Sequence, residues 1–185
     1  MRLKPEDSLL VVIDFQERLV PHIHNNKEVV ARAAKLVKGM KALDVPVVVT
    51  QQYTKGLGNT VSGITEALGF ENPADVPFIE KQSFSCLDCK EFKAEIDKAG
   101  RNNIIICGIE GHVCVLQTIV DLKGAGYNTV PVIDCISSRR QEDMLTGIKR
   151  YEYEKAVPTG FESVLFELCR FSGTDTFKAI SALVK

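Results

Sequence analysis

The sequence predicts an α/β fold, a three-layer sandwich in which a mostly parallel sheet has helices on both faces. The first observation is a set of short apolar runs rich in β-branched residues, which are typical of strands buried on both faces. The second is that segments with apolar residues at helical spacing separate these runs. Strands that alternate with helices form parallel sheets through right-handed crossovers. We therefore expect six strands in a single domain spanning residues 1–185.

The first two strands are expected at residues 8–13 (SLLVVI) and 46–50 (PVVVT). Pro46 can begin a strand because its missing N–H is tolerated at that position. Between these strands, Asn26 is a suitable N-cap for a helix over residues 27–43. The apolar residues of this helix recur at helical spacing and predict its buried face: Val29, Ala33, Leu36, Val37 and Met40.

Residues 51–69 form the longest irregular stretch, rich in Gly, Thr and Gln, with a short helix expected from Ser62. A loop of this length inside a compact domain is often functional. Residues 77–80 (PFIE) predict a short third strand that ends at Lys81, and residues 88–99 predict a helix closed by a glycine.

The fourth strand is expected at residues 104–107, and a helix that begins near Val113 follows it. Residues 129–134 (TVPVID) predict the fifth strand, although Pro131 is unusual in a central strand. The remaining expected elements are a charged helix over residues 141–154, a short sixth strand at 155–158 (KAVP), and closing helices over 161–169 and 174–184.

Composition argues against several classes of function. Basic residues number 23 and acidic residues 24, without a basic stripe, so nucleic-acid binding is not expected. No apolar run approaches the ~20 residues of a membrane span, and the N-terminal run ends at Asp14, which indicates no signal peptide. Six cysteines spread through the expected strands and helices suit a reducing compartment. We therefore expect a cytoplasmic protein that acts on a small molecule, with neither a nucleic-acid nor a membrane partner.

The stretch IIICGIEGHVCVLQT, residues 104–118, places Cys114 on the first turn of a helix that leaves the carboxyl end of a central strand. Ligands bind at such ends in open α/β sheets. The free N–H groups and dipole of a first helical turn favour an anion, so we expect Cys114 to tend toward a nucleophilic thiolate. The alternative interpretation is a small buried hydrophobic residue.

Asp14, Lys81 and Cys114 each lie at or just past the carboxyl end of an expected strand. In a parallel sheet these ends share one edge, so the three side chains can converge. The carboxylate would take the thiol proton, the ammonium would steady the negative charge, and first-turn N–H groups would hold an oxyanion. Taken singly, the aspartate could cap the next segment, the lysine could be solvated and the cysteine could belong to the core.

Four segments resemble the isochorismatase-like cysteine hydrolases: VVIDFQ around Asp14, VTQQY at residues 49–53, EKQSFS around Lys81 and GIEGHVCVLQT around Cys114. The loop TQQYTKGLG is most similar to the isochorismatase-domain-containing subfamily. Four motifs in the family's order, over residues 14–137, are more specific than any one of them. The resemblance implies a Rossmann-like, six-stranded parallel sheet, a catalytic triad at the three positions just named, and a homo-oligomer.

The resemblance also implies an oxyanion hole made by the backbone N–H groups of Cys114 and Glu110. A non-proline cis peptide in the family would correspond here to the bond between Ile109 and Glu110. Such a bond costs about 3 kcal/mol and persists only where the fold enforces it. Gly111 would ease the turn that follows.

Two departures from the family pattern narrow the chemistry. Nicotinamidases of this superfamily hold a metal through an Asp-x-His pair and a further His, whereas residues 51–54 here are Gln-Gln-Tyr-Thr. We therefore predict no catalytic metal, no other cofactor, and a substrate other than nicotinamide. True isochorismatases usually replace the cysteine, so Cys114 favours thioester chemistry on an amide, imide or related acyl compound. The resemblance implies a substrate pocket closed by Phe15, Gln16, Leu19, Gln52, Tyr53, Phe84 and His112.

Two other cysteine and histidine patterns carry weaker signals. The C-x-x-C formed by Cys86 and Cys89 could be redox-active or half of a zinc site, but no second C-x-x-C or His pair follows it. His22 and His24 have no third ligand near them in sequence, so a solvated loop is the preferred interpretation.

The function expected from the sequence is a metal-independent cysteine hydrolase. Two alternatives remain open at this point. The first is an isochorismatase-like fold used for binding or assembly without catalysis, since fold does not fix function. The second is a vinyl-ether hydrolase acting on isochorismate.

Overall fold

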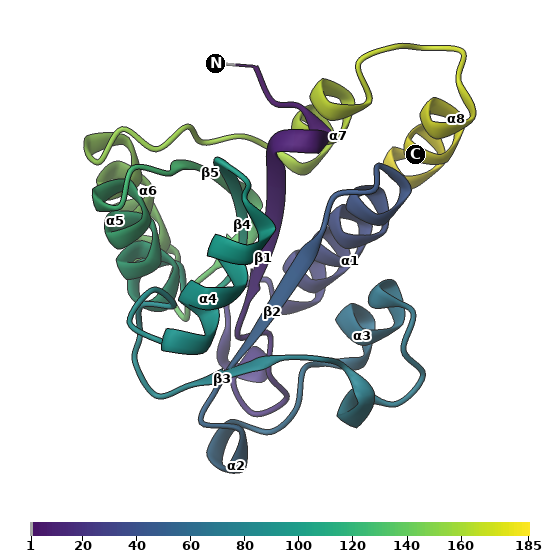
Figure 1. The fold of residues 1–185 in the computed structure, drawn as a ribbon. Helices are drawn as coiled ribbons and strands as arrows, with labels where there is room; N and C mark the ends of the chain where they lie inside the picture. Colours follow the sequence, from purple (N-terminus) through teal and green to yellow (C-terminus); the bar gives the residue numbers. More distant parts are fainter. Residues whose placement is uncertain (1) are drawn as a thin grey trace.

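The computed structural model describes residues 2–185 and has helices on both faces of a twisted central sheet (Figure 1). The sheet has five strands, all parallel, in the order β3-β2-β1-β4-β5. Their bounds are β1 Ser8–Ile13, β2 Val47–Gln52, β3 Ile79–Lys81, β4 Asn103–Ile109 and β5 Asn128–Ser137. The predicted α/β class is confirmed, with all strands parallel.

The prediction of a sixth strand at residues 155–158 is wrong. The segment runs beside the outer edge of β5, where the N–H of Val157 donates to the carbonyl of Thr129 at 3.0 Å. The pairing that follows is an isolated bridge between Val132 and Thr159. The bond that would continue the ladder runs from residue 131 of β5 to the Val157 carbonyl, and Pro131 has no N–H to donate, so only the isolated bridge forms.

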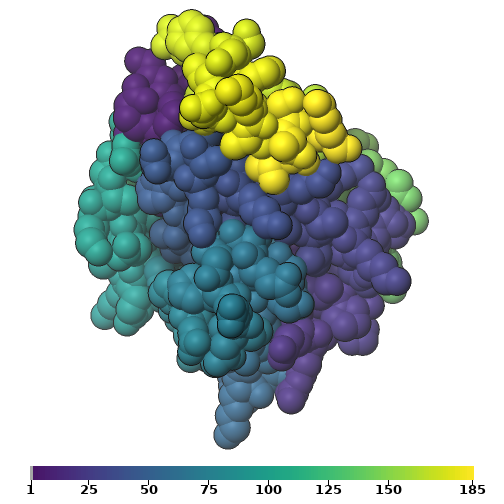
Figure 2. All heavy atoms as spheres, turned by 90° about the vertical axis from the view of Figure 1, so that its right-hand side faces the viewer, coloured from purple at the N-terminus to yellow at the C-terminus, as the bar shows by residue number. Residues whose placement is uncertain are grey.

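Helices α1, α3, α7 and α8 cover one face of the sheet, and α4, α5 and α6 cover the other (Figure 1). Figure 2 shows the first face, where the C-terminal helix α8 lies against α1 above the α3 region. The helices are α1 Asn26–Ala42, α2 Thr54–Leu57, α3 Ser62–Leu68, α4 Lys90–Ala99, α5 Leu116–Gly124, α6 Gln141–Tyr153, α7 Phe161–Cys169 and α8 Asp175–Val184.

Strand β1 divides the core into two parts. Leu10 and Val12 point into the cluster beneath α1, whereas Leu9, Val11 and Ile13 point into the cluster beneath α4 and α5. Successive side chains of a strand face opposite sides of the sheet, and here both sides are covered. Every residue of β1 is therefore buried, which explains its uninterrupted apolar sequence.

The stretch 51–69 is more regular than its composition indicated. Its first two residues complete β2, α2 follows, and α3 begins at the expected Ser62. This stretch, the turn after β1 and the segments after β3 and β4 all leave the carboxyl edge of the sheet. Connections of a parallel sheet diverge on either side of its central strand, and that edge is where α/β proteins bind ligands.

Candidate active site

Asp14 follows the last residue of β1 directly, and its backbone takes a left-handed conformation with φ of 54°. Its N–H still donates to the carbonyl of Thr50 on β2, so the chain leaves the sheet abruptly while the aspartate stays anchored. The carboxylate is fully buried. Its Oδ1 accepts a hydrogen bond from Thr50 Oγ1 at 2.8 Å, and its Oδ2 accepts one from Lys81 Nζ at 2.7 Å.

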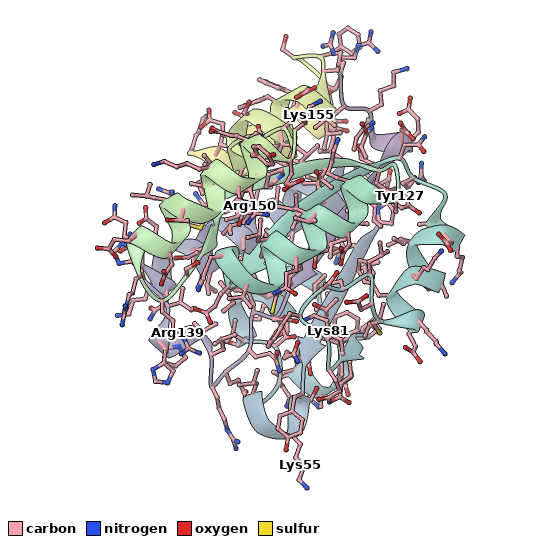
Figure 3. All side chains as sticks on the ribbon, turned by 90° about the vertical axis from the view of Figure 1, so that its left-hand side faces the viewer. Lys55, Lys81, Tyr127, Arg139, Arg150 and Lys155 are labelled. Carbon is pink, nitrogen blue, oxygen red and sulfur yellow. The ribbon has the colours of Figure 1, made fainter. Side chains whose placement is uncertain are left out.

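Lys81 is the last residue of β3, and its ammonium points inward, in contrast to Lys55 at the outer tip of the molecule (Figure 3). Besides Asp14, its Nζ donates to Gln52 Oε1 at 2.7 Å and to the carbonyls of Ser83 and Phe84, each at 3.2 Å. Burial by itself would lower the pKa of Lys81, but the charges around it, that of the hydrogen-bonded Asp14 first, outweigh burial and raise that pKa. An ammonium with these acceptors is a fixed positive charge.

Cys114 lies in one π-helical turn, Gly111–Val115, which joins β4 to α5, and it is 7% exposed. Single π-turns are frequent at functional sites. Burial and the negative charge of Asp14 raise the pKa of the Cys114 thiol to about 12, while Lys81 opposes that shift. The expectation of a resting thiolate is therefore wrong. The first-turn N–H groups do not compensate for the lost hydration of a buried sulfur beside an ion pair.

The segment before the thiol contains the cis peptide that the resemblance implies. The peptide between Ile109 and Glu110 is cis, and Ile109 is fully buried. The Glu110 carboxylate turns away to Arg139, whose N–H donates to it at 3.2 Å and whose Nε lies 3.3 Å from it. The Glu110 carbonyl accepts from the N–H groups of Val113 and Val115, which closes the turn.

Three of the seven residues expected to line the pocket are buried, and a fourth, Gln52, is half-buried and committed to internal hydrogen bonds. Phe15 and Leu19 are buried in the cluster beneath α1. Gln16 is fully buried, and its amide bridges the chain by donating to the carbonyls of Gln52 and Gly58 and accepting from the Gln52 N–H. The Gln52 side chain accepts from Lys81 and donates to the carbonyl of Gln82.

The other three expected pocket residues reach solvent near Lys81 or Cys114. Tyr53 and Phe84 are 48% and 54% exposed, and both are tied to Lys81 through the backbone. The N–H of Tyr53 donates to the Lys81 carbonyl, and the Phe84 carbonyl accepts from the Lys81 ammonium. His112 is half-buried, with its Nδ1 3.0 Å from Ser138 Oγ.

Three further residues of the site were not singled out from the sequence, although Thr50 and Thr118 lie within two of the quoted motifs. Thr50 holds Asp14, and a strand-end rule could have found it because it is paired with Ile13 at the end of β1. Thr118 Oγ1 accepts from the N–H of Cys86 at 2.9 Å and donates to the carbonyl of Cys114 at 2.7 Å. The third residue is Tyr151 of α6, whose hydroxyl donates to the carbonyl of Gly111.

The two cysteines of the C-x-x-C pair lie in different environments. Cys86 is fully buried in the cluster that contains Cys114, and burial together with the Asp14 charge raises its thiol pKa to about 12. Cys89 precedes α4, with its Sγ 3.2 Å from Glu91 Oε2. Both are free thiols.

Residues 2–185 contain no group of three or more His, Cys, Asp or Glu side chains placed to hold a metal ion. None of the helices that they form is both long and apolar enough to cross a bilayer.

Comparison with known proteins identifies relatives along the whole chain. A secreted isochorismatase effector, Isc1 of Phytophthora sojae, is 38% identical over 185 residues, covering 100% of this chain and 87% of that protein. The isochorismatase domain-containing protein 2A of Mus musculus is 33% identical, covering 100% and 85%. The structure of a MAR1 ribonuclease from Caenorhabditis elegans, 33% identical, superposes with a TM-score of 0.90 and covers 100% and 92%.

A more distant structure shares the fold alone. The YcaC protein of Escherichia coli, described as an octameric hydrolase of unknown specificity, is 19% identical with a TM-score of 0.90, covering 99% of this chain and 89% of that one. The isochorismatase domain family matches residues 8–163, which contain Asp14, Lys81 and Cys114. This chain therefore belongs to the isochorismatase family.

Proposed function

We propose that this protein is a cysteine hydrolase that cleaves a small amide- or imide-type C–N bond through a thioester on Cys114. The observation that carries the proposal is the buried ion pair of Asp14 and Lys81 beside a thiol at the start of a helix. In this arrangement a base, a fixed cation and a nucleophile face one another in a site of low polarity.

The raised pKa of the Cys114 thiol means that a base must remove its proton during attack. Because the thiol is neutral at rest, Asp14 takes the proton as sulfur attacks the substrate carbonyl. The N–H groups of Glu110 and Cys114 stabilise the oxyanion of the tetrahedral intermediate. The proton then passes to the leaving nitrogen, the C–N bond breaks, and Asp14 activates the water that hydrolyses the thioester.

Lys81 acts by its charge in this mechanism. Its ammonium already donates to Asp14, Gln52 and two backbone carbonyls, so it has no free hydrogen for the substrate. It is the counter-ion of the Asp14 carboxylate and balances the negative charge that forms during attack.

The proposed reaction is independent of a metal because the end of β2 offers poor ligands. Gln51 uses its amide to donate to Thr60 Oγ1 and to accept from Thr54 Oγ1, each at 2.9 Å. Gln52 holds Lys81 in the same way. Neutral amides committed to internal hydrogen bonds are unsuited to the nitrogen- and sulfur-rich sites that transition metals prefer.

The proposal includes a small-molecule substrate, a homo-oligomeric assembly and a cytoplasmic location. A hydrolase of the same fold is described as octameric, which supports assembly. Five of the six cysteines are buried free thiols, a state that suits a reducing compartment, although the Phytophthora relative is described as secreted.

Acyl capture tests the proposal. The protein would be mixed with p-nitrophenyl acetate, then with a panel of amides and imides, and the acyl adduct located by peptide mass spectrometry. We expect acetylation of Cys114 and loss of turnover in Cys114→Ala, with Cys89→Ala as the matched thiol control. Turnover that persists in Cys114→Ala would overturn the mechanism.

Isochorismate and single-stranded RNA complete the panel. The vinyl-ether alternative predicts cleavage of isochorismate without an acyl adduct. RNA is included because one relative is described as a ribonuclease. A reactive Cys114 with no turnover of any compound would favour the binding or assembly alternative.

A further inference from the structure

A buried tyrosine lies directly beneath the turn that carries the nucleophile. Tyr151 belongs to α6 and has no exposed surface, although most of that helix is charged or polar. Its hydroxyl donates to the carbonyl of Gly111 at 2.5 Å, across forty residues of sequence. The only other fully buried position of α6 is Gly147.

At this contact the backbone of α6 approaches the backbone of the Gly111 turn closely, with room for the Tyr151 hydroxyl between them. A Cβ added at Gly111 would lie 2.9 Å from Ile136 Cγ2 and 3.1 Å from the Tyr151 hydroxyl. A Cβ added at Gly147 would lie 3.5 Å from both that hydroxyl and the Cα of His112. Gly111 therefore lets α6 pack against the turn, whereas a Cβ at Gly147 would make only ordinary contacts, and the tyrosine supplies the polar contact between helix and turn.

The peptide that joins Gly111 to His112 is held at both ends. Its carbonyl accepts from Tyr151, and its N–H donates to Ser138 Oγ at 3.4 Å. This peptide lies between the two backbone donors of the proposed oxyanion hole, Glu110 and Cys114. Burial raises the pKa of Tyr151 well above its ordinary value, so the phenol keeps its proton and remains a donor.

We propose that Tyr151 is a positioning residue for the hydrolysis: by fixing the Gly111 carbonyl it aims the Glu110 and Cys114 N–H groups at the oxyanion. This inference rests on the proposed cysteine chemistry. Oxyanion donors act through their orientation, since a donor displaced from the developing charge loses most of its effect.

Two reactions of the Cys114 sulfur distinguish a positioning role of Tyr151 from a role in packing alone. Acylation by p-nitrophenyl acetate forms an S–C bond through a tetrahedral oxyanion, releases p-nitrophenolate, and passes the thiol proton to Asp14. Alkylation by iodoacetamide forms an S–C bond at a saturated carbon and expels iodide, without an oxyanion. Only the first reaction needs the aimed N–H groups. Because both rates are read on Cys114 of one sample, their ratio is insensitive to modest losses of folded protein.

We expect Tyr151→Phe to lower the ratio of acylation to alkylation by about tenfold or more. The matched control is Tyr127→Phe, which removes a hydroxyl bonded to Asp97 at 3.1 Å on the other side of α5 and should leave the ratio unchanged. An unchanged ratio in Tyr151→Phe, or an equal fall in both variants, overturns the inference. Acylation that persists in Cys114→Ala would instead contradict the proposed function itself.

Discussion

The Lys81 ammonium lies 2.7 Å from the Asp14 carboxylate, and neither side chain has any exposed surface. β2 separates the strands that carry them, so the lysine must reach past the end of β2 to meet the aspartate. Thr50 and Gln52, both on β2, hydrogen bond to the two members of the pair. The pair therefore joins three strands at the carboxyl edge of the sheet.

Removing only the cation from this pair should destabilise the fold. Lys81→Met leaves a buried carboxylate without its counter-ion, and breaking such a pair costs about 3–5 kcal/mol. Chemical denaturation would measure this loss, and the double variant Asp14→Asn with Lys81→Met should recover part of it. Lys93→Met, which breaks the exposed pair with Asp97, should hardly move the midpoint. Equal shifts for the two lysine variants would contradict the prediction.

Removing the base should separate thiol reactivity from turnover. The negative charge of Asp14 contributes to the raised pKa of Cys114, so Asp14→Asn should lower that pKa and speed iodoacetamide labelling at pH 7. Hydrolysis should nevertheless fall by at least about 100-fold, because no group takes the proton during attack. Parallel changes in labelling and turnover would count against Asp14 as the base.

Gly108 is expected to tolerate no side chain. Its φ is +149°, and an added Cβ would lie 2.5 Å from the Ile13 carbonyl oxygen on the neighbouring strand. Gly108→Ala should therefore cost about 3 kcal/mol or more, since β1 and β4 must separate. Gly124→Ala is the matched control, because an added Cβ on that α5 residue meets no atom within 4 Å. We expect Gly124→Ala to be neutral or slightly stabilising in thermal denaturation.

Alkaline pH should destabilise the protein through its buried thiols. The folded pKa of Cys86 is about 12, against an ordinary value of 9.0. Between these values the unfolded chain loses a proton that the folded chain retains, so the free energy of unfolding falls as pH rises. The contribution is about 1.4 kcal/mol per pH unit at most. Cys86→Ala should flatten the fall between pH 9 and 12, and an unchanged slope would show that Cys86 does not contribute.

The convergence of Asp14, Lys81 and Cys114 could be anticipated because it follows from topology. In a parallel sheet, residues at the carboxyl ends of different strands share one edge whatever their separation in sequence. Short apolar runs located those ends closely: Asp14 and Lys81 form an ion pair at this edge, and Cys114 lies near enough for both charges to act on its thiol. The same reasoning could have added Thr50, the last residue of the expected second strand and the partner of Ile13 on β1.

Other features depend on contacts that the sequence pattern does not encode. Phe15 and Leu19 follow β1 like site residues, but the chain folds back and buries them beneath α1. The ionisation of Cys114 depends on how much water the folded site excludes. Tyr151 lies on a charged helix, and nothing in its local sequence indicates that its hydroxyl reaches the turn after β4.

The burial of five of the six cysteines gives the chain two different sensitivities to oxidants over its lifetime. β1 pairs with β4 between Ser8 and Asn103, so the sheet closes only after about half of the chain has been synthesised. Cys86 and Cys89 leave the ribosome before that point, as ordinary thiols open to peroxide and mixed-disulfide formation. In the folded protein the sulfurs of Cys86 and Cys89 are buried. Thiol oxidation is therefore a far greater risk for the nascent chain than for the folded one.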